Sequence, residues 1–477
     1  MPSSPSVCES VVPSDLCIGC GVCAATCPVQ VLEMHINQFG EYVVAEKREG
    51  CLPNCDLCLQ VCPFGSNREN ESTLADARYQ AVPGIQHRSE TGYYLDCYIG
   101  HSRIDSHRIH GASGGLATWF LEKLLEDKIV DRVVCVVPTG DAGKLFRFAV
   151  LDSTDSVRRA SRSCYYPVEI RSALREVMAV EARYAITGLP CLHKAIQLAM
   201  CRNRRLRERV AVQVGLTCGQ NKSRFFSEYV AALGGGDPDQ LTGLQFRVKD
   251  PKRPASDWGL GFECTVAPGM SEKGTVFWTE GMGRAWRNGY FRLNPCNLCD
   301  DLFAEVADVT FMDAWLPGYR EDPRGHSLVI NRSMRFKATW DDELAGDHLE
   351  LDLLPVEQVI SSQRSQLLDK REAMQYRCFL TQKAGKQIPQ KRWPPEVTGN
   401  ILDRWLWRIR MQTGHTSREI WATKKNLSSL QAALRATDML LSVLTPLHWG
   451  LRVIRDGRVR KLLARRVRRV TKVAAEE

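Results

Sequence analysis

Two runs of closely spaced cysteines near the N-terminus constrain this chain more than any other feature. The first run is Cys17, Cys20, Cys23 and Cys27, and Pro28 follows it. The second run is Cys51, Cys55, Cys58 and Cys62, and Pro63 follows it. Both runs end in C-x2-C-x3-C-P, although the first gap of the second run is one residue longer. This ending is typical of segments that wrap a [4Fe–4S] cluster, because the short gaps let several thiolates reach one cubane.

The two runs together predict a module with two clusters that exchange a ligand. In two-cluster ferredoxins the fourth cysteine of each run binds the other cluster. We therefore expect one cluster on Cys17, Cys20, Cys23 and Cys62, and a second on Cys51, Cys55, Cys58 and Cys27. A zinc site is the alternative, but zinc sites usually show two separated C-x2-C pairs. Residues 1–65 are thus predicted to form an α+β, ferredoxin-like module.

The whole chain contains 19 cysteines in 477 residues, with apolar and charged contents, 44% and 25%, that are ordinary for a globular protein. The N-terminus lacks a charged segment followed by an apolar run, so we expect no secretory signal. Disulfides need an oxidising compartment, which makes cytoplasmic thiolates for metal or redox chemistry the better interpretation. No segment approaches the roughly 18 apolar residues of a membrane span.

The body of the chain alternates between short apolar strands and helices. Residues 66–92 are polar and are interpreted as a surface linker. Between 93 and 240, helices are expected at 114–127, from 192 and at 223–233, with strands at 131–137, 183–187 and 209–216. This order predicts an α/β sheet with substantial parallel pairing. Residues 241–392 begin strand-rich, with strands expected at 244–248, 261–266 and 275–278.

Four further cysteines stand where they can meet. Cys191 and Cys218 each follow a predicted strand, while Cys296 and Cys299 form a C-x2-C pair in a loop. The carboxyl ends of strands in α/β sheets face a common crevice, so these cysteines can supply four ligands to a third cluster. The alternative is that they are buried structural cysteines, the usual fate of isolated thiols.

A segment of small residues opens the first helix of the body. It consists of Gly111, Ala112, Ser113, Gly114 and Gly115. Such a helix start lets backbone amides approach a phosphate. It is not a G-x-G-x-x-G fingerprint, and taken alone the segment is better explained by a simple glycine-rich N-cap.

With these motifs in order, residues 93–332 resemble the family of beta subunits of coenzyme F420-dependent hydrogenases and dehydrogenases. The matching stretches are 110–115, 163–165, 188–191, 215–218, 246–249, Trp258, 292–296, Cys299, Asp308, Asp313, Trp315 and 325–327. The chain departs from the family's usual pattern at Leu192, where glutamine is frequent, and at Met312, where glycine is frequent.

This resemblance implies an FAD-containing iron–sulfur oxidoreductase with an α/β flavin-binding body. It implies a third [4Fe–4S] cluster on Cys191, Cys218, Cys296 and Cys299. It also implies that the segment from Gly111 to Gly115 cradles the flavin pyrophosphate. Ser163, Arg247 and Lys249 are the further cofactor-binding candidates.

The C-terminal region, residues 393–477, is predicted to be a helical basic tail. From residue 401 onward it holds 17 Lys and Arg against six Asp and Glu. Basic helices that carry tryptophan suit the surface of an anionic membrane, so contact with the inner face of a membrane is one interpretation. An acidic protein partner and a solvated helix face are the alternatives. The nearly neutral body argues against nucleic-acid binding.

Two functional hypotheses follow. The first is an enzyme in which FAD exchanges hydride with a small molecule, such as coenzyme F420 or an organic substrate, and the clusters exchange single electrons with ferredoxin or another carrier. The second is a non-catalytic electron-transfer subunit of a larger redox complex, which can be associated with a membrane. The sequence names no catalytic acid or base.

Overall fold

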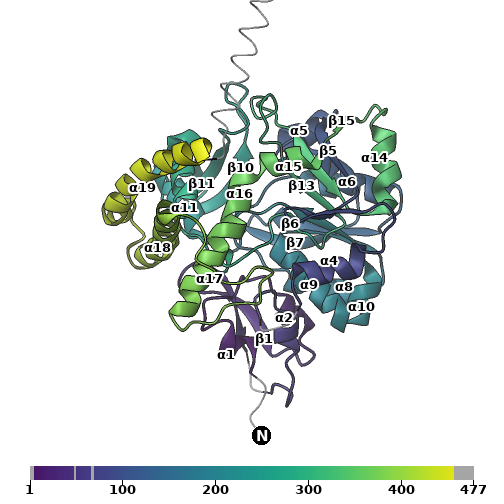
Figure 1. Ribbon diagram of the computed structural model, residues 1–477, viewed down its shortest axis with the longest axis horizontal. Coiled ribbons are helices and arrows are strands. Elements are labelled where there is room, and N and C mark those ends of the chain that lie inside the picture. Colours follow the sequence, from purple (N-terminus) through teal and green to yellow (C-terminus); the bar gives the residue numbers. More distant parts are fainter. Residues whose placement is uncertain (1–4, 48–49, 66–68, 456–477) are drawn as a thin grey trace, which may run out of the picture.

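The structure is a computed structural model that describes residues 5–47, 50–65 and 69–455. A large sheet lies at its centre (Figure 1). It has eight strands in the order β15-β5-β14-β13-β9-β8-β6-β7. The strands are β5 (Asp96–Ser102), β6 (Arg132–Pro138), β7 (Phe146–Leu151), β8 (Tyr184–Gly188), β9 (Val210–Leu216), β13 (Val309–Asp313), β14 (Ser327–Asn331) and β15 (Leu349–Leu353).

The sheet is parallel in its middle and antiparallel at both sides. Strands β6, β8, β9 and β13 pair in parallel, while β7 and the group β14, β5 and β15 add antiparallel pairs. The predicted α/β body with parallel pairing is therefore confirmed, within a mixed sheet. Because β8, β9 and β13 run the same way, the residues that follow them share one edge of the sheet.

Helices cover both faces of this sheet. They are α5 (Asp105–His110), α6 (Leu116–Glu126), α7 (Thr154–Arg159), α8 (Arg171–Ala179), α9 (Pro190–Arg202), α10 (Arg204–Arg209) and α14 (Lys337–Glu343). Leu116, Phe120 and Leu124 lie on one stripe of α6 and are buried against the sheet, as their spacing predicts.

The N-terminal module packs directly on this body. It comprises α1 (Val7–Ser10), α2 (Val22–Thr26), β1 (Leu32–Ile36), β2 (Tyr42–Glu46) and α3 (Leu57–Gln60). Val22 and Ala24 of α2 share a hydrophobic core with Ala173 and Leu174 of α8. The module and the sheet therefore have one continuous core on this side.

The segment interpreted as a polar linker contains more structure than its composition indicates. It forms α4 (Glu71–Tyr79) and β3 (Gln86–Arg88), which pairs with β4 (Gly92–Tyr94). The Tyr79 hydroxyl donates to the Val306 carbonyl at 3.0 Å, and Glu71 pairs with the buried Lys194 at 3.2 Å. Only a few residues of α4 are buried, and the rest of the helix is polar. Such a sequence gives only a weak signal for an amphipathic helix.

A second sheet and a helical layer complete the body. The strands expected after residue 241 form an antiparallel sheet of β10 (Leu241–Val248), β11 (Gly259–Ala267) and β12 (Met270–Phe277). Around it and beyond it lie α11 (Phe225–Leu233), η1 (Trp278–Glu280), α12 (Met282–Arg287), α13 (Asn294–Asn297), η2 (Met334–Phe336), α15 (Val356–Ser362), α16 (Arg364–Leu368), the π-helical turn η3 (Asp369–Ala373) and α17 (Met374–Lys383).

The chain closes with two long helices, α18 (Ile401–Lys424) and α19 (Leu427–Arg455), at one edge of the molecule (Figure 1). The predicted helices are present, but α18 is not a free basic surface. Its Arg418 is buried and pairs with Glu41 at 2.8 Å, and Trp421 donates to Glu228 at 2.9 Å. The last part of the predicted tail, 456–477, lies outside the described residues. Among those described, no helix is long and apolar enough to cross a bilayer.

Candidate cluster and cofactor site

The twelve predicted ligand cysteines fall into three sets of four in space. We call Cys27, Cys51, Cys55 and Cys58 the outer set. We call Cys17, Cys20, Cys23 and Cys62 the middle set. We call Cys191, Cys218, Cys296 and Cys299 the inner set.

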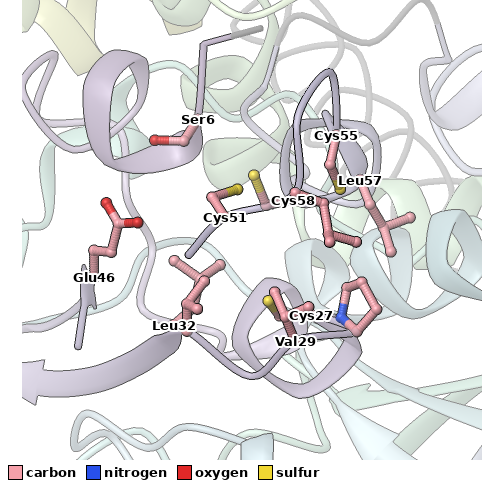
Figure 2. Close-up of a pocket in the computed structure, with 12 residues that line it drawn as sticks. Ser6, Cys27, Val29, Leu32, Glu46, Cys51, Cys55, Leu57 and Cys58 are labelled. Carbon is pink, nitrogen blue, oxygen red and sulfur yellow. The ribbon is translucent and has the colours of Figure 1, made fainter. Parts of the chain in front are cut away.

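The outer set surrounds a cavity close to the protein surface. All four of its cysteines line this cavity, together with Leu32, Glu46 and Leu57 (Figure 2). Cys27 follows α2, whereas the other three lie around α3, so the fourth ligand comes from the other run. Cys51 itself is exposed. The cysteines are thus placed as the crossed ligand assignment requires.

The middle set lies behind the outer set, in the shared core. Burial and, to a smaller extent, the neighbouring Cys17 raise the pKa of Cys20 to about 12. Cys62 has Cys20 and Cys17 as electrostatic neighbours, although it lies 42 positions after Cys20 in the sequence. Such burial favours the neutral form of the thiols. Bound iron would stabilise the thiolate form at this place.

Glycine at position 19 is what lets the chain wrap tightly around the middle set. Gly19 has φ +73°, and a Cβ at this position would lie 2.4 Å from the Tyr42 carbonyl oxygen. A side chain is therefore excluded both by conformation and by space.

The inner set gathers cysteines from distant parts of the chain. Cys191 follows β8, and Cys218 follows β9. Cys296 lies in α13, and Cys299 lies two residues after the end of that helix. Burial and then the neighbouring thiols of Cys299, Cys218 and Cys296 raise the pKa of Cys191. The parallel strand ends thus bring together the four cysteines that the sequence placed at a common crevice.

Positive charge surrounds the inner set. Lys370 of η3 is only 2% exposed, and no carboxylate of the described residues forms an ion pair with its ammonium. Its electrostatic partners are the thiolates, since Cys299, Cys218 and Cys296 raise its pKa although burial opposes this. A buried lysine needs a compensating anion. Four thiolates around iron carry such a charge, so the environment fits a cluster.

Hydrogen bonds also reach the inner sulfurs. The Asn221 amide donates to Cys296 Sγ at 3.2 Å. Arg292 donates to the Cys296 carbonyl at 2.7 Å and to Asp369 at 2.8 Å. Backbone donors to sulfur and nearby fixed charges are the groups by which a protein tunes a cluster. Lys370 and Arg292 carry no sequence pattern that identifies them as neighbours of a cluster.

The glycine segment lies at the same edge of the sheet as the inner set. Gly115 is the N-cap of α6 with φ +80°, and a Cβ on Gly114 would lie 2.6 Å from the Gly100 carbonyl oxygen. Arg247 donates to the Ala112 carbonyl at 3.0 Å. Lys249 donates to the Ser113 carbonyl at 2.8 Å. The structure therefore brings the two predicted cations onto the predicted cradle.

These cations lie in a cluster of charged side chains, in which Arg108, Arg247 and Lys249 face the carboxylates of Asp313 and Asp322. Burial and then Arg247 lower the pKa of Lys249 to about 7. Burial and then Arg108 lower the pKa of His101 to about 4. An anion bound here would relieve this mutual repulsion. The three cations outnumber the two carboxylates, so the cluster keeps an excess of positive charge, which fits a phosphate group.

Tyr165 connects the cradle to the inner set. It is an electrostatic neighbour of Arg247, Asp313 and Cys218, and Ser163 hydrogen-bonds to it. Arg247 also pairs with Asp313 at 2.8 Å. Next to Cys218, the buried Thr217 hydroxyl and the Gln220 carbonyl oxygen have no hydrogen-bond partner within the described part of the chain. Unpaired buried polar atoms at this position are what a bound polar group would satisfy.

One cluster of side chains was not singled out from the sequence. His101, His326 and Glu350 bring one ligand atom each within 4.8 Å of one another. Burial and then Arg108 lower the pKa of both histidines, and the nearby guanidinium disfavours a cation at this place. The group belongs to the same cluster of charged side chains. Only the order of strands β5, β14 and β15 in the sheet brings its members together.

Known protein families match the N-terminal module and the body of this chain separately. Residues 97–175 match the family model for the N-terminal part of the beta subunit of coenzyme F420 hydrogenase/dehydrogenase. Residues 181–356 match the model for the C-terminal part of the same beta subunit. Residues 16–66 match the model of a 4Fe-4S dicluster domain.

Two curated relatives are similar over parts of their length. A coenzyme F420-dependent sulfite reductase from Methanocaldococcus jannaschii is 25% identical over 68% of this chain and 45% of its own length. One subunit of the F(420)H(2) dehydrogenase of Methanosarcina mazei is 24% identical over 45% of this chain and 56% of its own length. The chain thus spans about half the length of these relatives.

Among solved structures, a chain of the F420-reducing [NiFe] hydrogenase complex from Methanosarcina barkeri superposes with a TM-score of 0.46 and 16% identity. The match covers 62% of this chain and 96% of that one. The two family models account for the sheet and the inner cysteines, and the dicluster model accounts for the N-terminal module. This chain therefore belongs to the family of coenzyme F420 hydrogenase/dehydrogenase beta subunits and carries a 4Fe-4S dicluster domain at its N-terminus.

Proposed function

We propose that this protein is an FAD- and iron–sulfur-dependent oxidoreductase. In this proposal a small-molecule hydride donor or acceptor, such as coenzyme F420 or an organic substrate, reacts at the cradle. Three [4Fe–4S] clusters on the inner, middle and outer sets connect that place to ferredoxin or another one-electron carrier. FAD, when bound, supplies the exchange between paired and single electrons.

One observation carries this proposal: thiols of all three sets pack against one hydrophobic core, which extends from the inner set to the outer set. Tyr165 interacts electrostatically with Arg247 of the cradle and with Cys218 of the inner set. Cys191 of the inner set has Cys20 of the middle set as an electrostatic neighbour. Cys23 of the middle set in turn has Cys58 of the outer set. Such a series can pass electrons between a cofactor at the cradle and a carrier at the surface.

The chain's own residues have distinct roles in this proposal. Arg247 binds the pyrophosphate, and its bond to the Ala112 carbonyl holds the cradle in shape. The Lys249 ammonium donates all three of its N–H groups to the carbonyls of Arg108, Ser113 and Arg324, so this side chain fixes the cradle and contributes positive charge to it. The aromatic side chains of Trp258 and Trp315 cover Arg247 and exclude water from it. Ser163 orients the Tyr165 hydroxyl.

The test is anaerobic purification followed by counts of iron, sulfide and acid-extracted flavin. We expect about twelve irons and one flavin per chain. Reduced coenzyme F420, NAD(P)H and reduced ferredoxin are then compared as donors. Iron without flavin would contradict the proposal of an enzyme and would favour a non-catalytic electron-transfer subunit. About eight irons per chain would contradict the proposal of a cluster on the inner set.

A variant of the cradle sharpens this experiment. In Gly114→Ala the new methyl group would meet the Gly100 carbonyl and the Ser327 amide, at 2.6 and 2.8 Å, and both are backbone atoms. We expect loss of flavin with retention of iron. Gly143→Ala is the matched control, because its nearest neighbour is the Asp141 side chain at 3.3 Å. Retained flavin in Gly114→Ala would place the cofactor elsewhere.

A further inference from the structure

Helix α19 is apolar on two opposite faces, and the protein uses only one of them. Leu430 and Leu434 are buried in the core that also holds Trp421 of α18 and Tyr229 of α11. Further along the same face, the buried Arg452 pairs with Asp403 at 3.2 Å. This face fully explains how α19 is attached to the molecule.

The opposite face carries a row of exposed apolar side chains. Met439 is 64% exposed, Val443 67% and Leu447 53%. These three recur every four residues, and Leu440 and Leu451 lie beside them at 40% and 47% exposure. We call these five residues the α19 stripe.

The α19 stripe contains no charged residue. Ala432 and Ala436 extend it toward the start of the helix, and both are exposed. The charged residues nearest in sequence, Arg435 and Asp438, project to its side by the helical repeat of about 100° per residue. A monomeric protein rarely leaves a continuous apolar surface of this kind in water.

Charge identifies what covers the stripe. The described part of α19 ends at Arg455, and residues 456–477 contain eight Lys and Arg against three Asp and Glu. An apolar helix face followed by a polybasic segment combines the two attractions that hold a helix on an anionic bilayer. A second copy of the chain that paired in parallel along α19 would instead bring two segments of the same charge together.

We propose that the exposed face of α19 lies on an anionic lipid bilayer, with the α19 stripe inserted among the headgroups and acyl chains. The helix lies along the surface and does not span it, in agreement with the lack of a spanning helix among the described residues. This attachment does not depend on the redox function proposed above. It differs from the tail contact expected from the sequence, because Trp407 and Trp421 are buried and take no part.

The experiment sediments the full-length holoprotein with vesicles of phosphatidylcholine, with and without phosphatidylserine. We expect binding to the phosphatidylserine vesicles, partial release by high salt, and little binding to phosphatidylcholine alone. Absence of binding to phosphatidylserine vesicles overturns the proposal.

Two double variants separate the stripe from charge in general. Val443→Glu with Leu447→Glu places two carboxylates in the stripe, and we expect the bound fraction to fall at least about tenfold. Gln431→Glu with Ser442→Glu adds the same charge on exposed positions at the side of the helix and is the matched control. Equal binding by the two double variants contradicts insertion of the stripe.

A third measurement distinguishes lipid from a second copy. Equal iron content and equal melting temperature establish that both variants are folded. We expect the wild type to sediment as a monomer in the absence of lipid. Concentration-dependent dimerisation that the stripe variant abolishes and the control retains would overturn the proposal, because a second copy would then be the occupant.

Discussion

The outer and inner cysteine sets use the same ligand type in opposite surroundings. The outer set lines a cavity near the surface, with Cys51 exposed. The inner set is enclosed, and the buried Lys370 and Arg292 lie against it. Solvent can compensate the charge of the outer set, whereas the protein must compensate that of the inner set. If both sets bind clusters as proposed, this difference would give two similar clusters separate potentials.

Removing one ligand from each set tests the comparison with the largest expected effect. Cys191→Ser and Cys51→Ser should each lower the iron content from about twelve to about eight per chain. In Cys191→Ser the remaining clusters should accept electrons from dithionite but no longer from the hydride donor, because the inner connection is lost. In Cys51→Ser the donor should still reduce the inner cluster. Iron analysis and EPR spectra of both variants measure this.

The opposite EPR pattern, with donor reduction surviving in Cys191→Ser, would reverse the order of the sets. Cys135→Ser is the control, since this thiol is buried in the core beneath the sheet and lies in no set. It should retain all its iron.

Replacing the compensating charge has an intermediate effect. Lys370→Met removes the buried ammonium but keeps an apolar side chain of similar length. The lost ammonium stabilises the reduced, more negative state of the inner cluster more than the oxidised state. The reduction potential of this cluster should therefore fall by on the order of 60 mV, which is a tenfold change in the equilibrium of a one-electron couple. An EPR-monitored redox titration measures the shift.

Lys383→Met is the matched control for this charge, because Lys383 lies exposed at the end of α17. The outer cluster's potential should stay unchanged in both variants. A downward shift of equal size at the outer cluster would mean that Lys370 acts on the molecule as a whole rather than on the inner set.

The smallest effect is expected at Cys8. This thiol of α1 lies beside the outer set, with burial, Glu46 and Cys58 raising its pKa to about 11. Cys27 already completes the four ligands, so Cys8→Ala should leave iron content and EPR spectra unchanged. A loss of about four irons would show that Cys8 is the fourth ligand and that the crossed assignment is wrong.

Much of the architecture could be predicted from local patterns. The stripe of Leu116, Phe120 and Leu124 predicted α6, and the apolar runs predicted β6, β8 and β9. The helix α4 was missed, because its few buried residues are hidden in a polar segment. The antiparallel strands β14 and β15 beside β5 could not be derived, since pairing at a sheet edge joins segments more than two hundred residues apart.

The sequence by itself determined the ligand chemistry: the spacing within 17–27 and 51–62 specifies cluster-binding runs, because neighbouring thiolates must reach one cubane. It also placed Cys191 and Cys218 at strand ends. Only the tertiary structure decided which charges face the inner set, since Lys370 reaches it through a helix packed from elsewhere. It likewise decided which face of α19 is used. Burial and charge compensation depend on packing between distant segments, and local sequence does not encode that packing.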